Sequence, residues 1–236
     1  MKITNVKTFK PNTRPFACNN NRCESKGEVA KKIGVALTCV GATLLPIITI
    51  SKHQGKLANL KGFKDLALKD KGKALFKAMD IDYGFKEMMT VGLTSILGGV
   101  TGGVLFDKET NPKKKIQEGI NKAAVLAVPA GLVAAGLKAF EHTKVKNPFA
   151  SIASVVVGVG VGMPIANKIS NTINKKVFGD DVFEKRNLKP TDYFVHVDDV
   201  VGAMVLSKVP FANKLHLDKV LGAIYAHQAY EAGSAK

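Results

Sequence analysis

Four long apolar stretches, separated by segments rich in lysine, dominate the pattern of hydrophobic and polar positions along the chain. None of the four contains a charged residue, and three reach 18 or 19 residues, close to the roughly 20 that a membrane-spanning helix needs. The third stretch is shorter, but Lys122 and Lys138 flank it and can extend their ammonium groups to the interface. The pattern predicts an all-α protein, a multi-pass bundle whose spans lie at about 33–50, 88–106, 120–140 and 148–167.

The stretch Ser154 to Ala166, SVVVGVGVGMPIA, also fits a β-strand, because its valines and glycines alternate. Small residues favour the helix instead. They recur every four positions in all four stretches, and residues four apart share one helix face, through which membrane helices pack closely. The rows are Gly34–Thr38–Ala42, Thr94–Gly98–Gly102, Ser95–Gly99–Gly103, Ala123–Ala127–Gly131–Ala135–Ala139 and Ser154–Gly158–Gly162–Ala166–Ser170. They predict spans that pack through glycine-zipper faces, and a protein that associates with itself.

A soluble helical protein is the main structural alternative. The mean hydropathy of +0.06 is low for a membrane protein, and helices in a soluble core can also be apolar all round. Against this, each glycine costs a helix in water about 1 kcal/mol relative to alanine. The number of glycines in the apolar stretches therefore favours the membrane.

Three prolines, Pro46, Pro129 and Pro164, lie inside or at the end of apolar stretches and predict kinks. Broken helices around a transport site would give a pore or transporter as an alternative function. No ionisable residue accompanies the prolines within the stretches, and coupled transport usually needs one. The prolines are therefore interpreted as structural.

The segment between the first two stretches, 51–87, is long and basic. Within it, apolar residues recur at helical spacing over 56–79 with lysines opposite them, which predicts a basic amphipathic helix at the membrane surface. Four spans place 51–87 on one side of the membrane, and the amino terminus and 107–119 on the other. Both sides are rich in lysine, so the positive-inside rule is only partly obeyed.

From about residue 171 the composition changes, and a repeat with a period of 20 residues follows. VHVDDVVGAMV at 195–205 aligns with LHLDKVLGAIY at 215–225. Because aspartate before an apolar-periodic run is a good N-cap, Asp198 and Asp218 predict helices at about 198–208 and 218–230. We expect these helices to form a small paired unit.

The repeat also suggests a metal site, since imidazole and carboxylate groups suit zinc or another divalent ion. The pattern H-x-D is short, however, and both aspartates already have a role as caps. We therefore expect no metal, cofactor or catalytic residues. The hypothetical ligands are His196, Asp198, His216 and Asp218, with His227 nearby.

The formal charge of +16 comes almost entirely from lysine, and tryptophan is absent. Specific recognition of nucleic acids favours arginine and aromatic stacking, so the charge suggests anionic lipids instead. Cys18 and Cys23 could pair or help to hold a metal, but a single C-x4-C is a weak signal, and free thiols, including Cys39, are the expectation. The chain carries no phosphate-loop or nucleophile-elbow motif, which predicts a protein that is not an enzyme.

The sequence thus predicts a basic polar tail at 1–32, a transmembrane region at 33–170 and a helical region at 171–236. We expect a structural or interaction role in a plasma membrane or bacterial inner membrane. The expected partners are membrane lipids, including anionic ones, and a second copy or another membrane protein, with no specific nucleic acid. The alternatives are the pore or transporter, and a soluble helical protein with the His/Asp metal site.

Overall fold

The computed structural model describes 18–19, 22–23, 26–56, 67, 70–71, 73–74, 81–142, 148–179, 183, 185–187, 197–207 and 214–235. The amphipathic helix predicted at 56–79 falls mostly outside these residues, and His196 lies outside them as well.

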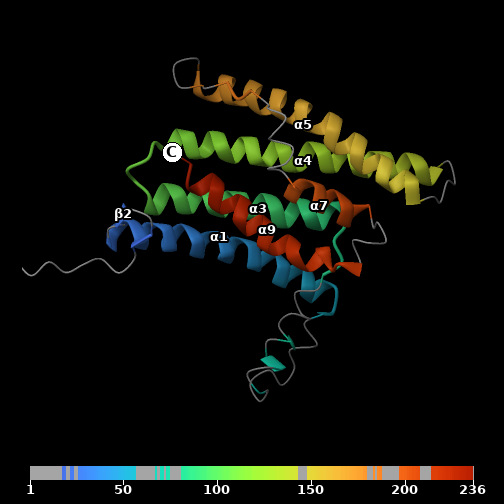
Figure 1. The fold of residues 1–236 in the computed structure, drawn as a ribbon, viewed down its shortest axis with the longest axis horizontal. Helices are drawn as coiled ribbons and strands as arrows, with labels where there is room; N and C mark the ends of the chain where they lie inside the picture. Colours follow the sequence, from blue (N-terminus) through green and yellow to red (C-terminus); the bar gives the residue numbers. More distant parts are fainter. Residues whose placement is uncertain are drawn as a thin grey trace, which may run out of the picture.

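The regular elements of the described chain are helices apart from one antiparallel pair of two-residue strands, β1 (Cys18–Asn19) and β2 (Arg22–Cys23). Four long helices lie side by side in sequence order (Figure 1), and each is long and apolar enough to cross a membrane. The all-α prediction is confirmed, and four helices that could span a membrane are present where they were predicted, although each extends beyond the predicted span. The long helices are α1 (Lys26–His53), α3 (Phe85–Phe106), α4 (Pro112–His142) and α5 (Pro148–Phe178).

Two shorter helices, α7 (Val197–Leu206) and α9 (Leu217–Gly233), lie against this layer. Helix α9 packs against α1, α3 and α4, while α7 packs against α4 and α5. Leu221 and Tyr225 of α9 join Ile47 and Met88 in the main apolar cluster. The carboxy-terminal helices are therefore present as predicted, and they take their packing from the long helices as well as from each other.

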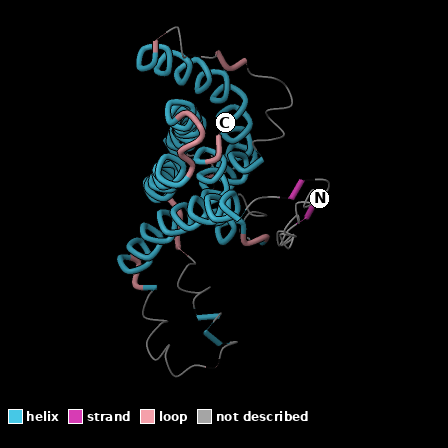
Figure 2. The backbone as a smooth tube through the Cα atoms, turned by 90° about the vertical axis from the view of Figure 1, so that its left-hand side faces the viewer, coloured by secondary structure: helices cyan, strands magenta, loops and turns pink. Residues whose placement is uncertain are grey.

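The helices alternate in direction, so one end of the molecule gathers the start of α1, the loop 107–111, the end of α5 and the end of α9. We call this the proximal end; it lies on the left of Figure 1 and faces the viewer in Figure 2. Ion pairs and hydrogen bonds join its parts. Lys31 pairs with Glu109, Lys115 with Gly233, and Asn174 with Gln117.

Local signals set several helix ends. Asn111 caps α4, since its Oδ1 accepts a hydrogen bond from the Lys113 N–H over 3.0 Å, and Pro112 occupies the first helical position. Gly55 and Gly179, which follow α1 and α5, have φ of +74° and +73°, a backbone conformation that glycine adopts without strain.

The caps predicted at the repeat are wrong. The N-cap of α9 is His216, with φ of 50°, and Asp218 is the second residue of the helix. Helix α7 begins at Val197, one residue before Asp198. A carboxylate in the first turn still interacts favourably with the positive end of the helix dipole, so an aspartate near the start of an apolar run does not by itself locate the cap.

The small-residue rows of α3 and α5 are used within the chain, whereas a methyl group added at Gly131, in the row of α4, would meet open space. A methyl group added at Gly98 or Gly102 would collide with Ala42 or Thr38 of α1, and one added at Gly99 would collide with the Ala229 carbonyl of α9. The two rows predicted in α3 therefore face two different helices. In α5, the row contacts α4, with Gly158 against Val133 and Gly162 against Pro129.

Candidate functional site

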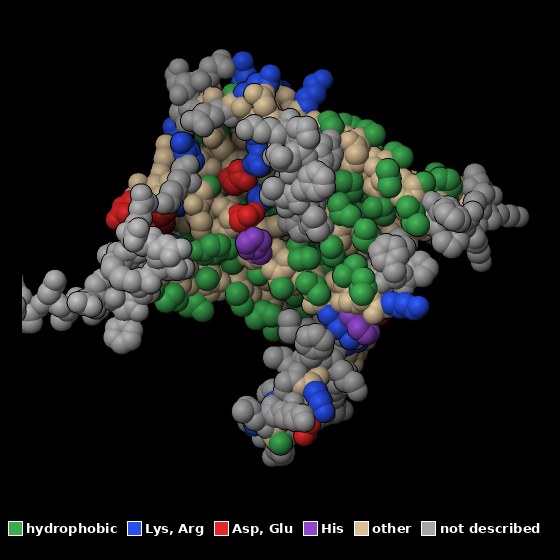
Figure 3. All heavy atoms as spheres, viewed as in Figure 1, with side chains coloured by type: hydrophobic (Ala, Val, Ile, Leu, Met, Phe, Trp, Pro, Cys, Tyr) green, Lys and Arg blue, Asp and Glu red, His purple; other side chains and the backbone are tan. Residues whose placement is uncertain are grey.

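Large apolar side chains remain exposed along the long helices. Leu37, Leu97 and Val156 are about two-thirds exposed, at 68%, 67% and 65%. Hydrophobic side chains spread over much of the face drawn in Figure 3, whereas Lys and Arg side chains lie mainly towards its edges. On α5 the exposed residues form a row along the helix: Ile152, Val156, Val157, Val161, Ile165, Ile169, Ile173 and Val177. In water an exposed apolar surface of this size would promote aggregation, whereas it is compatible with contact to lipid tails.

The proximal end is polar, and its buried charges are paired. Lys115 of α4 is fully buried. Its Nζ donates to Asp107 Oδ2 over 2.6 Å and to the Gly233 carbonyl over 3.0 Å. The hydrogen bond from Lys115 holds the pKa of Asp107 below its usual value. This pair connects the start of α4 to the loop before it and to the end of α9.

A second set of charges lies two helical turns further along α4. Lys122, which is 6% exposed, donates to Glu231 Oε2 of α9 over 2.6 Å. The other carboxylate oxygen of Glu231 lies 3.6 Å from Nε2 of His227. The α4–α9 contact therefore carries one ion pair, between Lys122 and Glu231, in addition to the hydrogen bond from Lys115 to Gly233.

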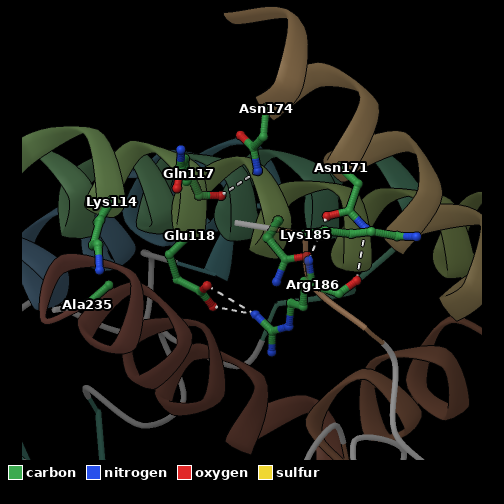
Figure 4. Close-up of a pocket in the computed structure, with 9 residues that line it drawn as sticks. Lys114, Gln117, Glu118, Asn171, Asn174, Lys185, Arg186 and Ala235 are labelled. Carbon is green, nitrogen blue, oxygen red and sulfur yellow. Dashed lines mark hydrogen bonds and ion pairs between the residues drawn. The ribbon is translucent and has the colours of Figure 1, made fainter. Parts of the chain in front are cut away.

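A cavity of about 260 Å³ opens between α4, α5 and the segment 185–187. Its wall combines buried amides with charged side chains (Figure 4). The residues that matter for its chemistry are Lys114, Glu118, Asn121, Asn174, Lys185 and Arg186.

Asparagines of α5 fix the segment 185–187 beside this cavity. Asn171 pairs with the main chain of Arg186: its Nδ2 donates to the carbonyl over 2.9 Å, and its Oδ1 accepts from the N–H over 3.1 Å. Asn167 donates to the same carbonyl over 3.1 Å. The guanidinium of Arg186 then reaches α4, where Nη1 donates to both oxygens of Glu118 over 3.1 and 3.0 Å. Arg186 is thus held at both its main chain and its side chain.

A larger cavity, of about 590 Å³, lies at the same end between α1, the loop 107–110 and α9. Acidic and basic side chains line it in similar numbers. Lys31 pairs there with Glu109, and Asp107 pairs with Lys115. Its charges are therefore mutually neutralised.

The structure describes only some of the hypothetical metal ligands. No group of three or more His, Cys, Asp or Glu side chains is suitably placed among the described residues. His216 is exposed, and His227 faces Glu231. The side chain of Asp198 is outside the described part of the structure, so the full set is not tested. Cys18 and Cys23 are opposed across the β1–β2 pair, and Cys39 is a buried free thiol.

The asparagines at the cavity did not enter the sequence prediction, although the sequence carries a signal for them. Asn167, Asn171 and Asn174 follow at intervals of four and three residues, so they share one face of α5 directly after its apolar stretch. A polar face at the end of a span indicates a contact outside the lipid tails.

Together, the four long apolar helices and their exposed apolar surface are compatible with a multi-pass membrane protein. No known family model, curated protein or solved structure matches the chain.

Proposed function

We propose that this is an integral multi-pass membrane protein with a structural or interaction role rather than a catalytic one. The observation that carries the proposal is the apolar surface of the long helices, which is left exposed by the intramolecular packing. The non-catalytic role is consistent with a sequence that lacks phosphate-loop and nucleophile-elbow motifs.

We further propose that the lipids around the proximal end are anionic. Exposed lysines there include Lys108, Lys175 and Lys176, next to helix ends that leave the apolar region. Each lysine near an anionic leaflet contributes about 1 kcal/mol of attraction. A plasma membrane or bacterial inner membrane provides such a surface on its cytoplasmic side.

The small-residue rows of α3 and α5 give no support to self-association, because α1, α4 and α9 already occupy their faces, whereas the row of α4 is open at Gly131. A second copy would have to bind the outer surface of the layer. Lipid is therefore the principal partner that we propose.

The test is fractionation of cells that express the full chain, followed by an alkaline carbonate wash of the membranes. An integral protein stays in the pellet and needs detergent for release. Release into the carbonate supernatant would contradict the proposal, because it would show that the apolar row of α5 is not embedded in the membrane.

A further inference from the structure

We propose that helices α7 and α9 lie within the apolar layer of the membrane, and that the outward face of α9 contacts lipid tails. The inference rests on the proposed membrane location of the four long helices. It extends that location to the carboxy-terminal region, which follows the last predicted span in the sequence.

Helix α9 follows the apolar stretch of α1 along most of its length. A methyl group added at Gly222 of α9 would meet Ile47, and one added at Gly233 would meet Val35. Val35 and Ile47 lie near the two ends of the stretch 33–50. Because the contact runs from one end of this stretch to the other, α9 lies at the depth of the hydrocarbon wherever α1 spans it.

The contact between α9 and α3 leads to the same depth. A methyl group added at Gly92 would meet Leu126 of α4 and Tyr225 of α9. One added at Gly99 would meet the Ala229 carbonyl, and both glycines lie inside the apolar stretch of α3. Tyr225 and Ala229 are buried, at 2% and 0% exposed. Packing this close leaves no room for lipid or water between the two helices, so α9 belongs to the bundle at the depth of the α3 span.

Helix α7 reaches the middle of α4 and α5. Its residue Ala203, which is 2% exposed, belongs to an apolar cluster with Val133 of α4 and Val159 of α5. Both valines lie inside the apolar stretches of their helices. The 10 residues of α7 extend over about 15 Å. Since the hydrocarbon layer is about 30 Å thick, α7 occupies about half of its depth.

The chain therefore crosses the layer twice more after α5. Arg186 lies at the proximal end, where it bonds with Asn171 and Glu118. Helix α9 begins near the opposite end, where burial and then the nearby carboxylate of Asp218 raise the pKa of Tyr83. It ends again at the proximal end. The end of α9 thus shares a side of the membrane with the start of α1.

The outward face of α9 is apolar in its first half. Val220 is 47% exposed and Ala223 is exposed as well, and no charged residue occurs over 220–226. Ionisable groups follow in the second half, where Glu231 pairs with Lys122 of α4 and also lies beside His227. Pairing of this kind is how membrane proteins hold charges at depth. The face around Ala223 is therefore the part of α9 that suits lipid tails.

The experiment attaches a nitroxide label to single cysteines in the full chain, without Cys18, Cys23 and Cys39, in phospholipid vesicles. The accessibility of each label to oxygen, which enters lipid tails, is compared with its accessibility to a polar nickel chelate, which stays in water. Ala223→Cys tests the outward face of α9. Leu97→Cys is the lipid reference, because Leu97 is 67% exposed in the middle of α3, and Lys108→Cys in the loop 107–111 is the water reference.

We expect the label at position 223 to resemble that at position 97, with a ratio of oxygen to chelate accessibility at least about tenfold above that at position 108. Val220→Cys places a second label on the same face and should give the same result, should the first variant fail to fold. In sealed vesicles of one orientation, an impermeant maleimide should also label Lys214→Cys, just before α9, from the side opposite to position 108.

Chelate accessibility at position 223 equal to that at position 108, with position 97 still in lipid, would overturn the inference and leave the proposed function standing. Low accessibility to both reagents at positions 220 and 223 would also overturn it, because another protein or a second copy would then cover this face. Labelling of positions 214 and 108 from one side would overturn the added crossings. Chelate accessibility at position 97 itself would refute the proposed membrane location, and the inference with it.

Discussion

The fully buried ammonium of Lys115 makes the proximal end depend on a single carboxylate. Asp107 is its charged partner, and the Gly233 carbonyl completes the site. Removing one member of a buried pair leaves the other charge uncompensated, which costs about 3–5 kcal/mol. Because the Asp107 side chain retains 20% exposure, water can partly solvate it but cannot reach Lys115.

We therefore expect Asp107→Asn to lower the free energy of unfolding by about 3 kcal/mol, measured by denaturation in detergent. Lys31→Gln is the control. Lys31 pairs with Glu109, whose side chain is 81% exposed, so we expect its loss to cost less than about 1 kcal/mol. Equal losses of unfolding free energy for the two variants would mean that the Lys115–Asp107 pair does not stabilise the proximal end.

The same pair predicts a dependence of stability on pH. Its hydrogen bond with Lys115 lowers the pKa of Asp107 in the folded state below the ordinary 3.8. The resulting stabilisation is complete above that ordinary value and is lost as the pH falls through the folded-state pKa. Unfolding midpoints measured from pH 6 down to pH 2.5 should therefore fall more for the wild type than for Asp107→Asn. Parallel curves would assign the acid sensitivity to other groups.

At the scale of the elements, α3 is the most constrained helix because it contacts α1 with one small-residue row and α9 with another. The backbone of α9 lies directly against Gly99 and Gly103. Thr43 and Ser95 add a buried hydrogen bond of 2.8 Å between α1 and α3. Close approach of this kind allows dispersion and polar contacts where lipid provides no hydrophobic drive.

Gly99→Ala tests this packing. The added methyl would meet the Ala229 carbonyl, so α9 must shift, and overpacking of this kind costs about 1–3 kcal/mol. Gly160→Ala in α5 is the matched control, because a methyl there meets open space. We expect a lower thermal midpoint in detergent for Gly99→Ala and an unchanged or higher one for Gly160→Ala. The reverse order would show that α9 does not dock on α3 as described.

The helices were predictable because their apolar stretches and small-residue rows are local properties of the sequence. The helix that each row contacts could not be predicted. Gly98 and Gly99 are adjacent in the sequence, yet they face α1 and α9, and nothing in the local sequence distinguishes them. The sequence did not predict the cavity between α4 and α5, for a related reason. Asn121 and Asn174 are separated by 53 positions, and only the antiparallel packing of α4 against α5 brings them together.

At the scale of the whole molecule, the layer fixes which segments share a side of the membrane. The loop 107–111 and the end of α5 belong to the proximal end, whereas the end of α1 and the start of α3 belong to the opposite end. At the opposite end, Gln54 and Asp82 connect the end of α1 to the start of α3. The Gln54 side chain accepts a hydrogen bond from the Asp82 N–H over 2.8 Å and donates one to the Asp82 carbonyl over 2.9 Å. The four helices therefore run in alternating directions, and we expect them to cross the membrane in the same alternation.

Cysteine labelling tests this arrangement. In a variant without Cys18, Cys23 and Cys39, single cysteines would replace Lys108, Lys176 or Lys52, all of which are exposed. In sealed vesicles of one orientation, an impermeant maleimide should label positions 108 and 176 from the same side, and position 52 only from the other side. Each helix has to cross the whole apolar layer for this result, because a hairpin that turns back within the membrane returns both its ends to one side. Labelling of positions 52 and 108 from one side would mean that α3 does not span, and the four-helix arrangement in the membrane would be wrong.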